Sequence, residues 1–262
     1  MATDMIAPER RKLILSSLNA RGVISLKDMA AELGVAEITV RRDIEKLELE
    51  GRLKRVQGGA ASLEESDGAE LTMRQKTSIH AGEKEIVAKY AAGLVQDGDS
   101  VFLDGGTTIV PLAAALLQRR INIITYNTMF LSKNPHPVAQ IFLIGGEYLP
   151  HYGMNVGLIA QDLLRQFYFD KAFFGCAGVD LEQQVVCSTE MQSLAMKRIA
   201  LEQATHRYLL MDSSKFSTKG LMRVCEVSRF DAVVCDRYIG SPAQRPENLV
   251  AVEEQEAYGK RS

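Results

Sequence analysis

The chain has 262 residues, of which 46% are hydrophobic and 24% charged, and its formal net charge is −2. Such a chain is long enough to bury a sizeable core in one or two domains, and its net charge excludes a protein that coats nucleic acid indiscriminately. No apolar run approaches the about 18 residues of a membrane span. The first residues lack the apolar stretch of a secretory signal, so we expect a cytoplasmic protein without membrane contact.

The cysteines and histidines show no pattern of a metal or catalytic site. The cysteines form no CxxC pair and have no histidine nearby, so we expect free thiols, no bound metal and no cofactor. The histidines are too dispersed to form a triad. The residues concerned are Cys176, Cys187, Cys225, Cys235, His80, His136, His151 and His206.

The first fifty residues predict three short helices. Pro8 suits the first turn of a helix that Gly22 ends, and Ser25 is placed to cap a second helix that Gly34 stops. A third helix is expected from residue 36 or 37 to Leu49. Short helices joined by a turn this tight are typical of a helix-turn-helix.

The third predicted helix has one apolar face and one polar face. Val40, Ile44 and Leu47 share the first, while Ile38, Thr39 and Arg42 lie opposite with Arg41 on the flank. Arginines near a helix N-terminus suit a DNA major groove, where they grip guanine or phosphate. The outward Ile38 fits a thymine methyl group or a partner helix. A plain amphipathic helix with a solvated charged face explains the same helix equally well.

The residues after this helix predict a basic hairpin. Gly51 breaks the helix, residues 52–57 have the character of a strand, and Gly58-Gly59 forms a tight turn. A basic hairpin at this place is a wing, and it favours DNA binding. The side chains that we expect to lie along phosphates or a groove edge are Lys54, Arg55 and Gln57.

Residues 9–60, and above all TVRRDIEKLELEGRLKRVQGGA, resemble the DeoR-type winged helix-turn-helix of bacterial sugar-catabolism repressors. The resemblance implies a small N-terminal α+β DNA-binding domain, residues 1–62. One departure is Ala36, where the family usually has serine. This change removes a helix cap worth about 1 kcal/mol and one candidate phosphate contact.

Residues 63–82 are polar and predict a linker, and from residue 83 apolar helices and strands alternate. This pattern predicts a larger α/β domain, residues 83–262, with a mostly parallel sheet covered on both faces. Ligands bind beyond the carboxyl ends of such strands. Strands are expected at 100–104, 121–126, 139–146, 171–175, 207–212, 231–236 and 249–252, and helices at 83–95, 107–119, 161–167 and 190–204.

The stretch VFLDGGTT predicts a strand, a tight loop and a helix start. Gly105, Gly106, Thr107 and Thr108 fit a phosphate loop, although glycines alone also fit a simple turn between a strand and a helix. Asp104 before them is placed either to orient sugar hydroxyls or to cap the following helix.

The larger domain also resembles the family's effector domain, which is similar in fold to ribose-5-phosphate isomerase and glucosamine-6-phosphate deaminase. The matching pieces are DGDSVFLDGGTT, ITYN, IGG, DKAFFGCAGVD, STEMQSLAMKR and MDSSKF. The resemblance implies a phosphorylated sugar as effector, with Asn127 at a strand end and Lys215 meeting a phosphate or sugar oxygen. The acidic stretch of the isomerase falls on residues 174–178, which contain no carboxylate. Proton transfer between sugar carbons needs a carboxylate base, so we expect no enzyme and no catalytic residue.

Several alternatives stay open at this point. Glu190 and Lys197 share a helix face and either reach the effector or form a surface pair. Arg74 and Lys84 either couple effector to DNA binding or are solvated charges. The family implies a homo-oligomer. The leading hypothesis is a repressor of carbohydrate-catabolism genes released from its DNA operator by a phosphorylated sugar; the alternative is an isomerase or deaminase with an accessory DNA-binding domain.

Overall fold

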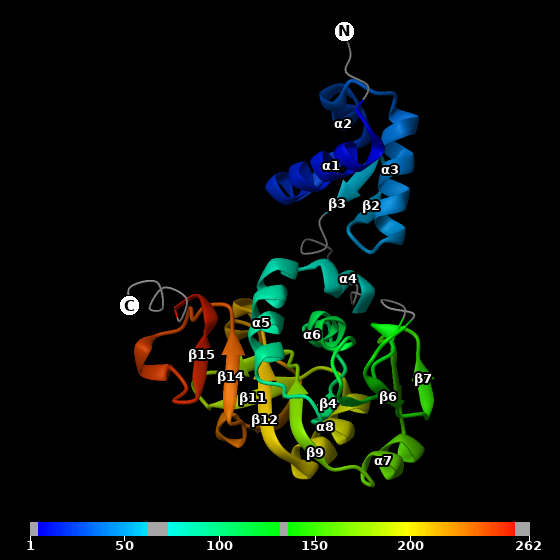
Figure 1. The fold of residues 1–262 in the computed structure, drawn as a ribbon. Coiled ribbons are helices and arrows are strands. Elements are labelled where there is room, and N and C mark those ends of the chain that lie inside the picture. The colour runs from blue at the N-terminus through cyan, green and yellow to red at the C-terminus, as the bar shows by residue number, and fades with distance from the viewer. Residues whose placement is uncertain (1–4, 62–72, 132–135, 255–262) are drawn as a thin grey trace. The chain divides into compact units, whose positions relative to one another are not determined.

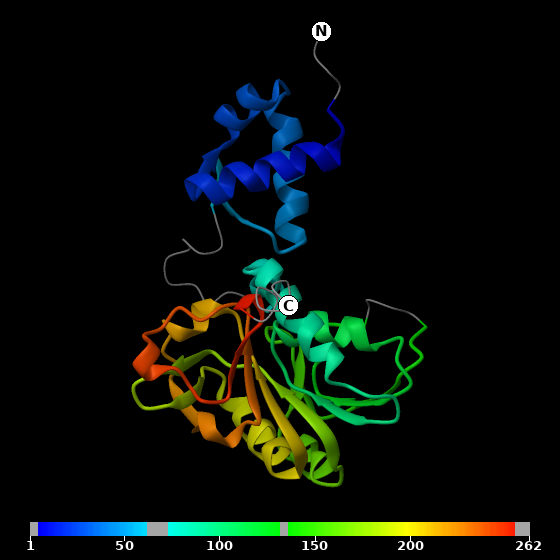
Figure 2. The same ribbon diagram turned by 60° about the vertical axis from the view of Figure 1, so that its left-hand side comes forward.

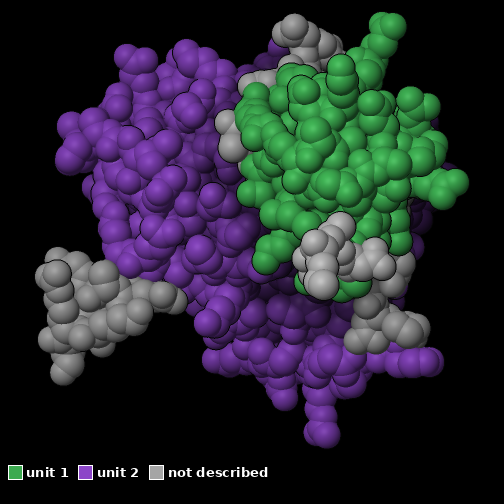
Figure 3. Space-filling view, turned by 90° about the horizontal axis from the view of Figure 1, so that it is seen from above, with its two compact units in different colours: residues 1–79 green, residues 80–262 purple. Residues whose placement is uncertain are grey.

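The computed structural model describes residues 5–61, 73–131 and 136–254. The chain divides into two compact units, Met1–Ile79 and His80–Ser262, which Figure 3 colours separately. The expected linker 63–82 lies partly outside the described residues. Its described part contains the helix α4 (Met73–Ser78) and the first residues of the next helix.

The described residues of unit 1 before α4 form three helices and a small antiparallel sheet (Figure 1). The strand order is β1-β3-β2, so the wing hairpin of β2 and β3 pairs back onto β1. Its elements before α4 are α1 (Ala7–Arg21), β1 (Val23–Ser25), α2 (Leu26–Leu33), α3 (Glu37–Leu49), β2 (Lys54–Val56) and β3 (Gly59–Ala61).

The predicted helix signals of unit 1 are confirmed. The first turn of α1 contains proline and Gly22 ends the helix, while the Ser25 hydroxyl accepts a hydrogen bond from the Asp28 backbone N–H at 3.0 Å. Gly59 lets β3 approach β1, because a Cβ there would lie 1.9 Å from the Ile24 carbonyl oxygen. The strand β1 was not predicted, since three residues are too few to show a period.

Unit 2 contains a seven-stranded sheet in the order β15-β14-β12-β9-β4-β5-β6, with every neighbouring pair parallel. This confirms the predicted α/β class. Its strands are β4 (Ser100–Leu103), β5 (Asn122–Thr125), β6 (Gln140–Leu143), β9 (Phe169–Phe174), β12 (Ala204–Leu210), β14 (Ala232–Cys235) and β15 (Leu249–Ala251).

Helices cover both faces of this sheet (Figures 1 and 2). One face packs α5 (Ala81–Gly93) and α6 (Ile109–Leu116); the other packs α8 (Met191–Gln203), with α7 (Leu158–Leu164) beside it. Side chains alternate between the faces along a strand. Val101 and Leu103 join the buried cluster of α5 and α6, whereas the Phe102 ring lies 5.2 Å from that of Phe169.

The chain order defines a switch point in the sheet. From β4 the chain adds β5 and β6 on one side, and then β9, β12, β14 and β15 on the other. The direction therefore reverses between β4 and β9, where open α/β sheets bind ligands. Short antiparallel pieces that were not predicted surround this sheet: the hairpin β7 (Glu147–Leu149) and β8 (Met154–Val156), and the sheet β10 (Gly178–Asp180), β11 (Val185–Ser188) and β13 (Met222–Glu226).

Candidate functional sites

The outward face of α3 carries the residues predicted to contact DNA. Ile38, Arg41 and Arg42 are exposed and Thr39 is half-buried. Among the described residues, neither arginine guanidinium has a hydrogen bond or ion pair to another side chain. A planar cationic group that is exposed and unengaged is available for bidentate contacts with guanine or phosphate.

The inward face of α3 holds a charged residue that the sequence pattern did not single out. Asp43 is buried beside Val40 and Ile44, and accepts a hydrogen bond from Arg10 Nε of α1 at 2.8 Å. Arg10 also donates to the Met5 carbonyl at 2.6 Å. This buried ion pair fixes α1 against α3. The burial of Asp43 could have been predicted from its spacing, because Asp43 lies three residues after Val40 and therefore on the apolar face of the helix.

The wing shows one side chain already engaged. Lys54 is half-buried and Gln57 is exposed, but Arg55 reaches back to α3, with Nη1 2.8 Å from Glu45 Oε1 and Nε 2.8 Å from Glu48 Oε2. Arg55 therefore orients the wing on α3. A phosphate contact by Arg55 requires it to leave two carboxylates.

In unit 2, the loop after β4 brings its backbone close to other elements. A Cβ on Gly105 would lie 2.9 Å from the Tyr126 ring, and Gly106 has a φ of +138°. Thr107 and Thr108 follow at the start of α6, where backbone N–H groups favour an anion.

A buried lysine lies beside this loop. Lys84 of α5 donates a hydrogen bond to Thr107 Oγ1 at 3.0 Å and is enclosed by protein. The alternative of a solvated Lys84 is therefore wrong. The sequence does contain a sign of this burial, because Lys84 lies one helical turn before Val87 and Ala88, which are buried on the same face of α5. The side chain of Arg74 lies outside the described residues.

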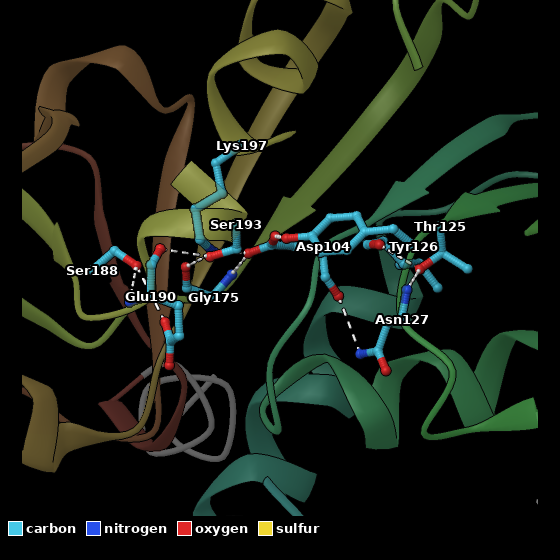
Figure 4. Close-up of polar contacts among 10 residues, drawn as sticks. Asp104, Thr125, Tyr126, Asn127, Gly175, Ser188, Glu190, Ser193 and Lys197 are labelled. Carbon is cyan, nitrogen blue, oxygen red and sulfur yellow. Dashed lines mark hydrogen bonds and ion pairs between the residues drawn. The ribbon is translucent and has the colours of Figure 1, made fainter. Parts of the chain in front are cut away.

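Asp104, at the switch point, is the centre of a hydrogen-bond network (Figure 4). One carboxylate oxygen accepts the Tyr126 hydroxyl. The other accepts the Gly175 backbone N–H at 2.9 Å and the Lys197 ammonium, which also donates to the Gly175 carbonyl at 2.9 Å. The side chain of Asp104 makes no cap on α6, so the capping alternative is wrong.

The network is closed to solvent. Asp104 is 0% and Lys197 3% exposed, so the alternative of a surface pair for Lys197 is also wrong. Burial raises the pKa of Tyr126 well above its usual value, and the negative charge of Asp104 acts in the same direction. Tyr126 therefore remains a neutral donor that supports the Asp104 carboxylate. The ion pair between Asp104 and Lys197, together with the hydrogen bonds of Gly175, ties the carboxyl ends of β4 and β9 to α8.

Asn127 and Glu190 flank this network. Asn127 donates to the Asp104 carbonyl at 3.3 Å and accepts from the Met129 N–H at 2.9 Å, so it shapes the turn after β5. Glu190 is half-buried immediately before α8, and its carboxylate accepts the Ser188 hydroxyl at 3.2 Å (Figure 4).

The end of β12 carries a carboxylate oxygen without a partner. Asp212 is buried; its Oδ1 accepts the Ser214 backbone N–H at 3.2 Å and also the Ser214 hydroxyl. Its Oδ2 has no hydrogen-bond partner among the described residues. A buried acceptor of this kind is costly to leave unpaired and suits a ligand hydroxyl.

Lys215 lies in the turn that Asp212 begins, where its backbone N–H donates to the Asp212 carbonyl at 3.1 Å, and the charge of Asp212 acts on the pKa of Cys176. Lys215 is half-buried two residues after Ser213, and its ammonium has no hydrogen bond or ion pair within the described residues. Burial raises the pKa of the Cys176 thiol to about 12, while the charges of Lys215 and Lys197 act against this shift. Cys176 thus lies within electrostatic reach of both lysines and stays protonated at neutral pH. It was not among the predicted site residues.

In the described part of the chain, no group of three or more His, Cys, Asp or Glu side chains is arranged to hold a metal ion. None of the helices in residues 5–61, 73–131 and 136–254 has the length and apolar character needed to cross a lipid bilayer.

A helix-turn-helix unit with a wing, joined to a parallel α/β unit with polar groups at its strand ends, defines a DNA-binding regulator with a sensor domain. Residues 10–66 match the DeoR-like helix-turn-helix domain, and residues 79–237 match the DeoR C terminal sensor domain. The chain belongs to the DeoR family of transcriptional regulators.

Curated relatives agree with this assignment. The chain is 30% identical to the lactose phosphotransferase system repressor of Staphylococcus epidermidis, over 93% of this chain and 98% of the relative. It is 33% identical to the repressor of the same name in Lactococcus lactis, over 88% and 91%. It is 32% identical to the helix-turn-helix transcriptional regulator FruR of Bacillus subtilis, over 81% and 84%.

Among solved structures, the chain is similar to ribose 5-phosphate isomerase A of Methanocaldococcus jannaschii. The identity is 18%, the TM-score is 0.39, and the match covers 52% of this chain and 55% of that chain. A likeness of this extent carries no argument about chemistry.

Proposed function

We propose that this regulator represses a carbohydrate-catabolism operon and that a phosphorylated sugar, bound at the carboxyl edge of the seven-stranded sheet, releases it from DNA. The names of the relatives, which are repressors of lactose phosphotransferase systems, support a sugar-linked role. In this proposal residues 1–62 form a domain that binds DNA in the cytoplasm, and residues 63–82 link it to the larger domain. Residues 83–262 bind the effector and form the contact between copies of the chain.

The observation that carries the effector proposal is the unpaired Oδ2 of buried Asp212, which begins the short turn that also holds Lys215. A sugar hydroxyl donating to this oxygen and an oxygen accepting from Lys215 would satisfy both groups. A carboxylate acceptor and an ammonium donor that both lack partners select a polyhydroxylated ligand over an apolar one.

The phosphate has its own place in this proposal. The backbone N–H groups of Gly106, Thr107 and Thr108 at the start of α6 would hold it together with the buried ammonium of Lys84, 3.0 Å from Thr107 Oγ1. The strands β4 and β12 are separated by β9 alone, so their ends lie about 10 Å apart. An extended sugar phosphate can bridge such a span.

We propose sensing without turnover. The Asp104 carboxylate is occupied by Tyr126, Gly175 and Lys197, so it is not placed to move a substrate proton. Residues 174–178 offer no other carboxylate. Asp104 and Lys197 then act by holding the site in shape, and Glu190 and Asn127 line it.

On DNA, we propose that α3 enters the major groove. Arg41 and Arg42 would contact bases and phosphates, and Ile38 and Thr39 would pack against base edges. The wing would touch the backbone through Lys54 and Gln57, and through Arg55 once it is released from α3. Two copies would occupy two half-sites of an operator.

A titration tests this function. The complex with DNA from upstream of the neighbouring genes is titrated at one fixed salt concentration with a panel of sugar phosphates, with inorganic phosphate as control. At least one sugar phosphate is expected to lower operator affinity by tenfold or more. A panel that changes neither operator affinity nor Tm would refute the proposal.

A further inference from the structure

Asp236 follows the last residue of β14 and has a buried carboxylate that belongs to neither proposed site. It is 0% exposed. Among the described residues, its one ion pair joins Oδ2 to Nε of Arg237 at 3.8 Å, and the Arg237 side chain is 61% exposed. A solvated cation at this distance offsets little of the free energy that burying a charge costs. A neutral side chain would suffice for packing alone, so the hydrogen bonds of this carboxylate indicate its role.

Both oxygens of the Asp236 carboxylate bind one residue, Ser213. Oδ1 accepts the Ser213 backbone N–H at 2.6 Å, and Oδ2 accepts the Ser213 hydroxyl at 2.9 Å. Ser213 is itself only 7% exposed, so water competes little for these hydrogen bonds. Two bonds from one carboxylate to one residue restrict both the position and the orientation of that residue.

The main chain that carries Asp236 is held from both neighbouring strands. The strand β14 lies between β12 and β15 in the sheet. On the β15 side, the Asp236 carbonyl accepts the Glu253 backbone N–H at 3.0 Å. On the β12 side, the Met211 N–H donates to the Val234 carbonyl at 3.0 Å. The Asp236 carboxylate is therefore a fixed support for the turn that follows β12.

The turn that Ser213 begins also contains Lys215. It is a short 3-10 helix, η2 (Ser213–Phe216), and the Lys215 backbone N–H donates to the Asp212 carbonyl at 3.1 Å. The Lys215 side chain is half-buried, and its ammonium has no hydrogen bond or ion pair within the described residues. The place of this ammonium is therefore set by the backbone of the turn and not by a partner of its own.

We propose that Asp236 is a positioning residue of the effector site: through Ser213 it holds the turn in the conformation that directs the Lys215 ammonium to an oxygen of the sugar phosphate. The inference rests on the proposed function, and it adds the end of β14 to the strand ends that build the site. Asp236 acts through Lys215 and makes no contact with the effector. Its contribution should therefore appear in effector affinity only while Lys215 is present.

The first test compares Asp236→Ala with Asp236→Asn in the full chain. Release of labelled operator is titrated at one salt concentration with the member of the sugar-phosphate panel that releases the wild type. Asp236→Ala removes both bonds to Ser213 and should weaken effector affinity about tenfold. Asp236→Asn removes the charge but keeps an acceptor for the Ser213 N–H and a polar partner for its hydroxyl, so affinity should stay within about threefold of the wild type. Thermal unfolding of each variant separates lost effector affinity from lost folded protein.

The second test is a double-mutant cycle with Lys215→Ala. Ser213→Ala removes the hydroxyl bond to Asp236 alone and should weaken effector affinity about threefold. In the Lys215→Ala background it should cause no further loss, because the group that the turn positions is gone. The matched control is Ser217→Ala, which removes the hydrogen bond from the Ser217 hydroxyl to the Ser214 carbonyl at 3.0 Å and should keep wild-type effector affinity.

Three results would overturn the proposal: wild-type effector affinity in Asp236→Ala, equal losses in Asp236→Ala and Asp236→Asn, or an undiminished effect of Ser213→Ala in the Lys215→Ala background. If Asp236→Ala does not fold, the cycle with Ser213→Ala still decides. A wild type that no sugar phosphate releases from operator would instead overturn the proposed function, and this inference with it.

Discussion

Arg42 and Lys197 are both cations on helices, and the structure treats them in opposite ways. Arg42 is exposed on α3, and no described residue engages its guanidinium. Lys197 on α8 is 3% exposed and bonded to Asp104 and Gly175. An exposed unengaged cation can recognise an outside anion. An enclosed, paired cation fixes the backbone around it instead. The comparison separates the surface that we propose reads DNA from the framework of the sensor domain.

The largest expected effect comes from breaking the enclosed pair. Lys197→Met leaves Asp104 as an uncompensated buried charge, which should lower the free energy of unfolding of unit 2 by about 3–5 kcal/mol. Urea unfolding measures this loss. The combined variant Asp104→Asn/Lys197→Met removes both charges and should recover most of the stability. Arg42→Ala should leave the free energy of unfolding of unit 2 unchanged. If Arg42→Ala lowered it as much as Lys197→Met does, the distinction between the enclosed and the exposed cation would be contradicted.

The second expected effect tests whether the ammonium of Lys215 in unit 2, which has no partner among the described residues, binds the effector. Lys215→Ala removes a charged partner for the effector, which should weaken effector affinity by about 1.5–3 kcal/mol, or roughly tenfold to a hundredfold. Operator affinity without effector should stay at the wild-type value. Fluorescence anisotropy of labelled operator, titrated with the releasing sugar phosphate, measures both quantities. Normal release in this variant would contradict the place given to Lys215.

The third effect concerns the exposed cation. Arg42→Ala should weaken operator binding by about 1–3 kcal/mol and relax base preference at one position in each half-site. Effector affinity should not change, because the substitution lies in unit 1. Anisotropy with operators altered one base pair at a time measures this at fixed salt. Unchanged operator affinity would refute the placement of α3 in the groove.

The smallest effect tests the intermediate case, Arg55, which is exposed yet paired. Arg55→Ala should lower the stability of unit 1 by at most about 1 kcal/mol, since exposed ion pairs contribute little. It should weaken operator binding less than Arg42→Ala does, because Arg55 is held by Glu45 and Glu48. The two variants are compared by urea unfolding and anisotropy. A larger DNA effect for Arg55→Ala would show that the wing leaves α3 on binding.

Much of this organisation was predictable from the sequence, because hydrophobic period and capping residues are local. The inward face of Val40, Ile44 and Leu47 and the Ser25 cap were expected and are confirmed. The strands of the parallel sheet were expected from continuous apolar runs. The strands β1, β7, β8, β10, β11 and β13 were not, since their few residues are defined by their pairing partners.

The candidate site was predictable only in part. The predicted strands 100–104 and 207–212 end at Asp104 and Asp212, and the carboxyl ends of such strands are where α/β sheets bind ligands. The pairing of Asp104 with Lys197 joins residues 93 positions apart, and no spacing rule connects them. The burial of Lys84 and Asp43 was hidden by their charge, because charged side chains are enclosed only when a partner, here Thr107 or Arg10, comes from elsewhere in the chain.

The central claim is that this chain senses a sugar phosphate and does not convert it. The most direct measurement follows one sample of the operator complex with the releasing sugar phosphate by anisotropy and by ³¹P NMR. We predict that operator is released while the phosphorus spectrum keeps the resonances of the added sugar phosphate over hours. Conversion of the sugar phosphate into a new species at a rate that scales with protein concentration would contradict the account.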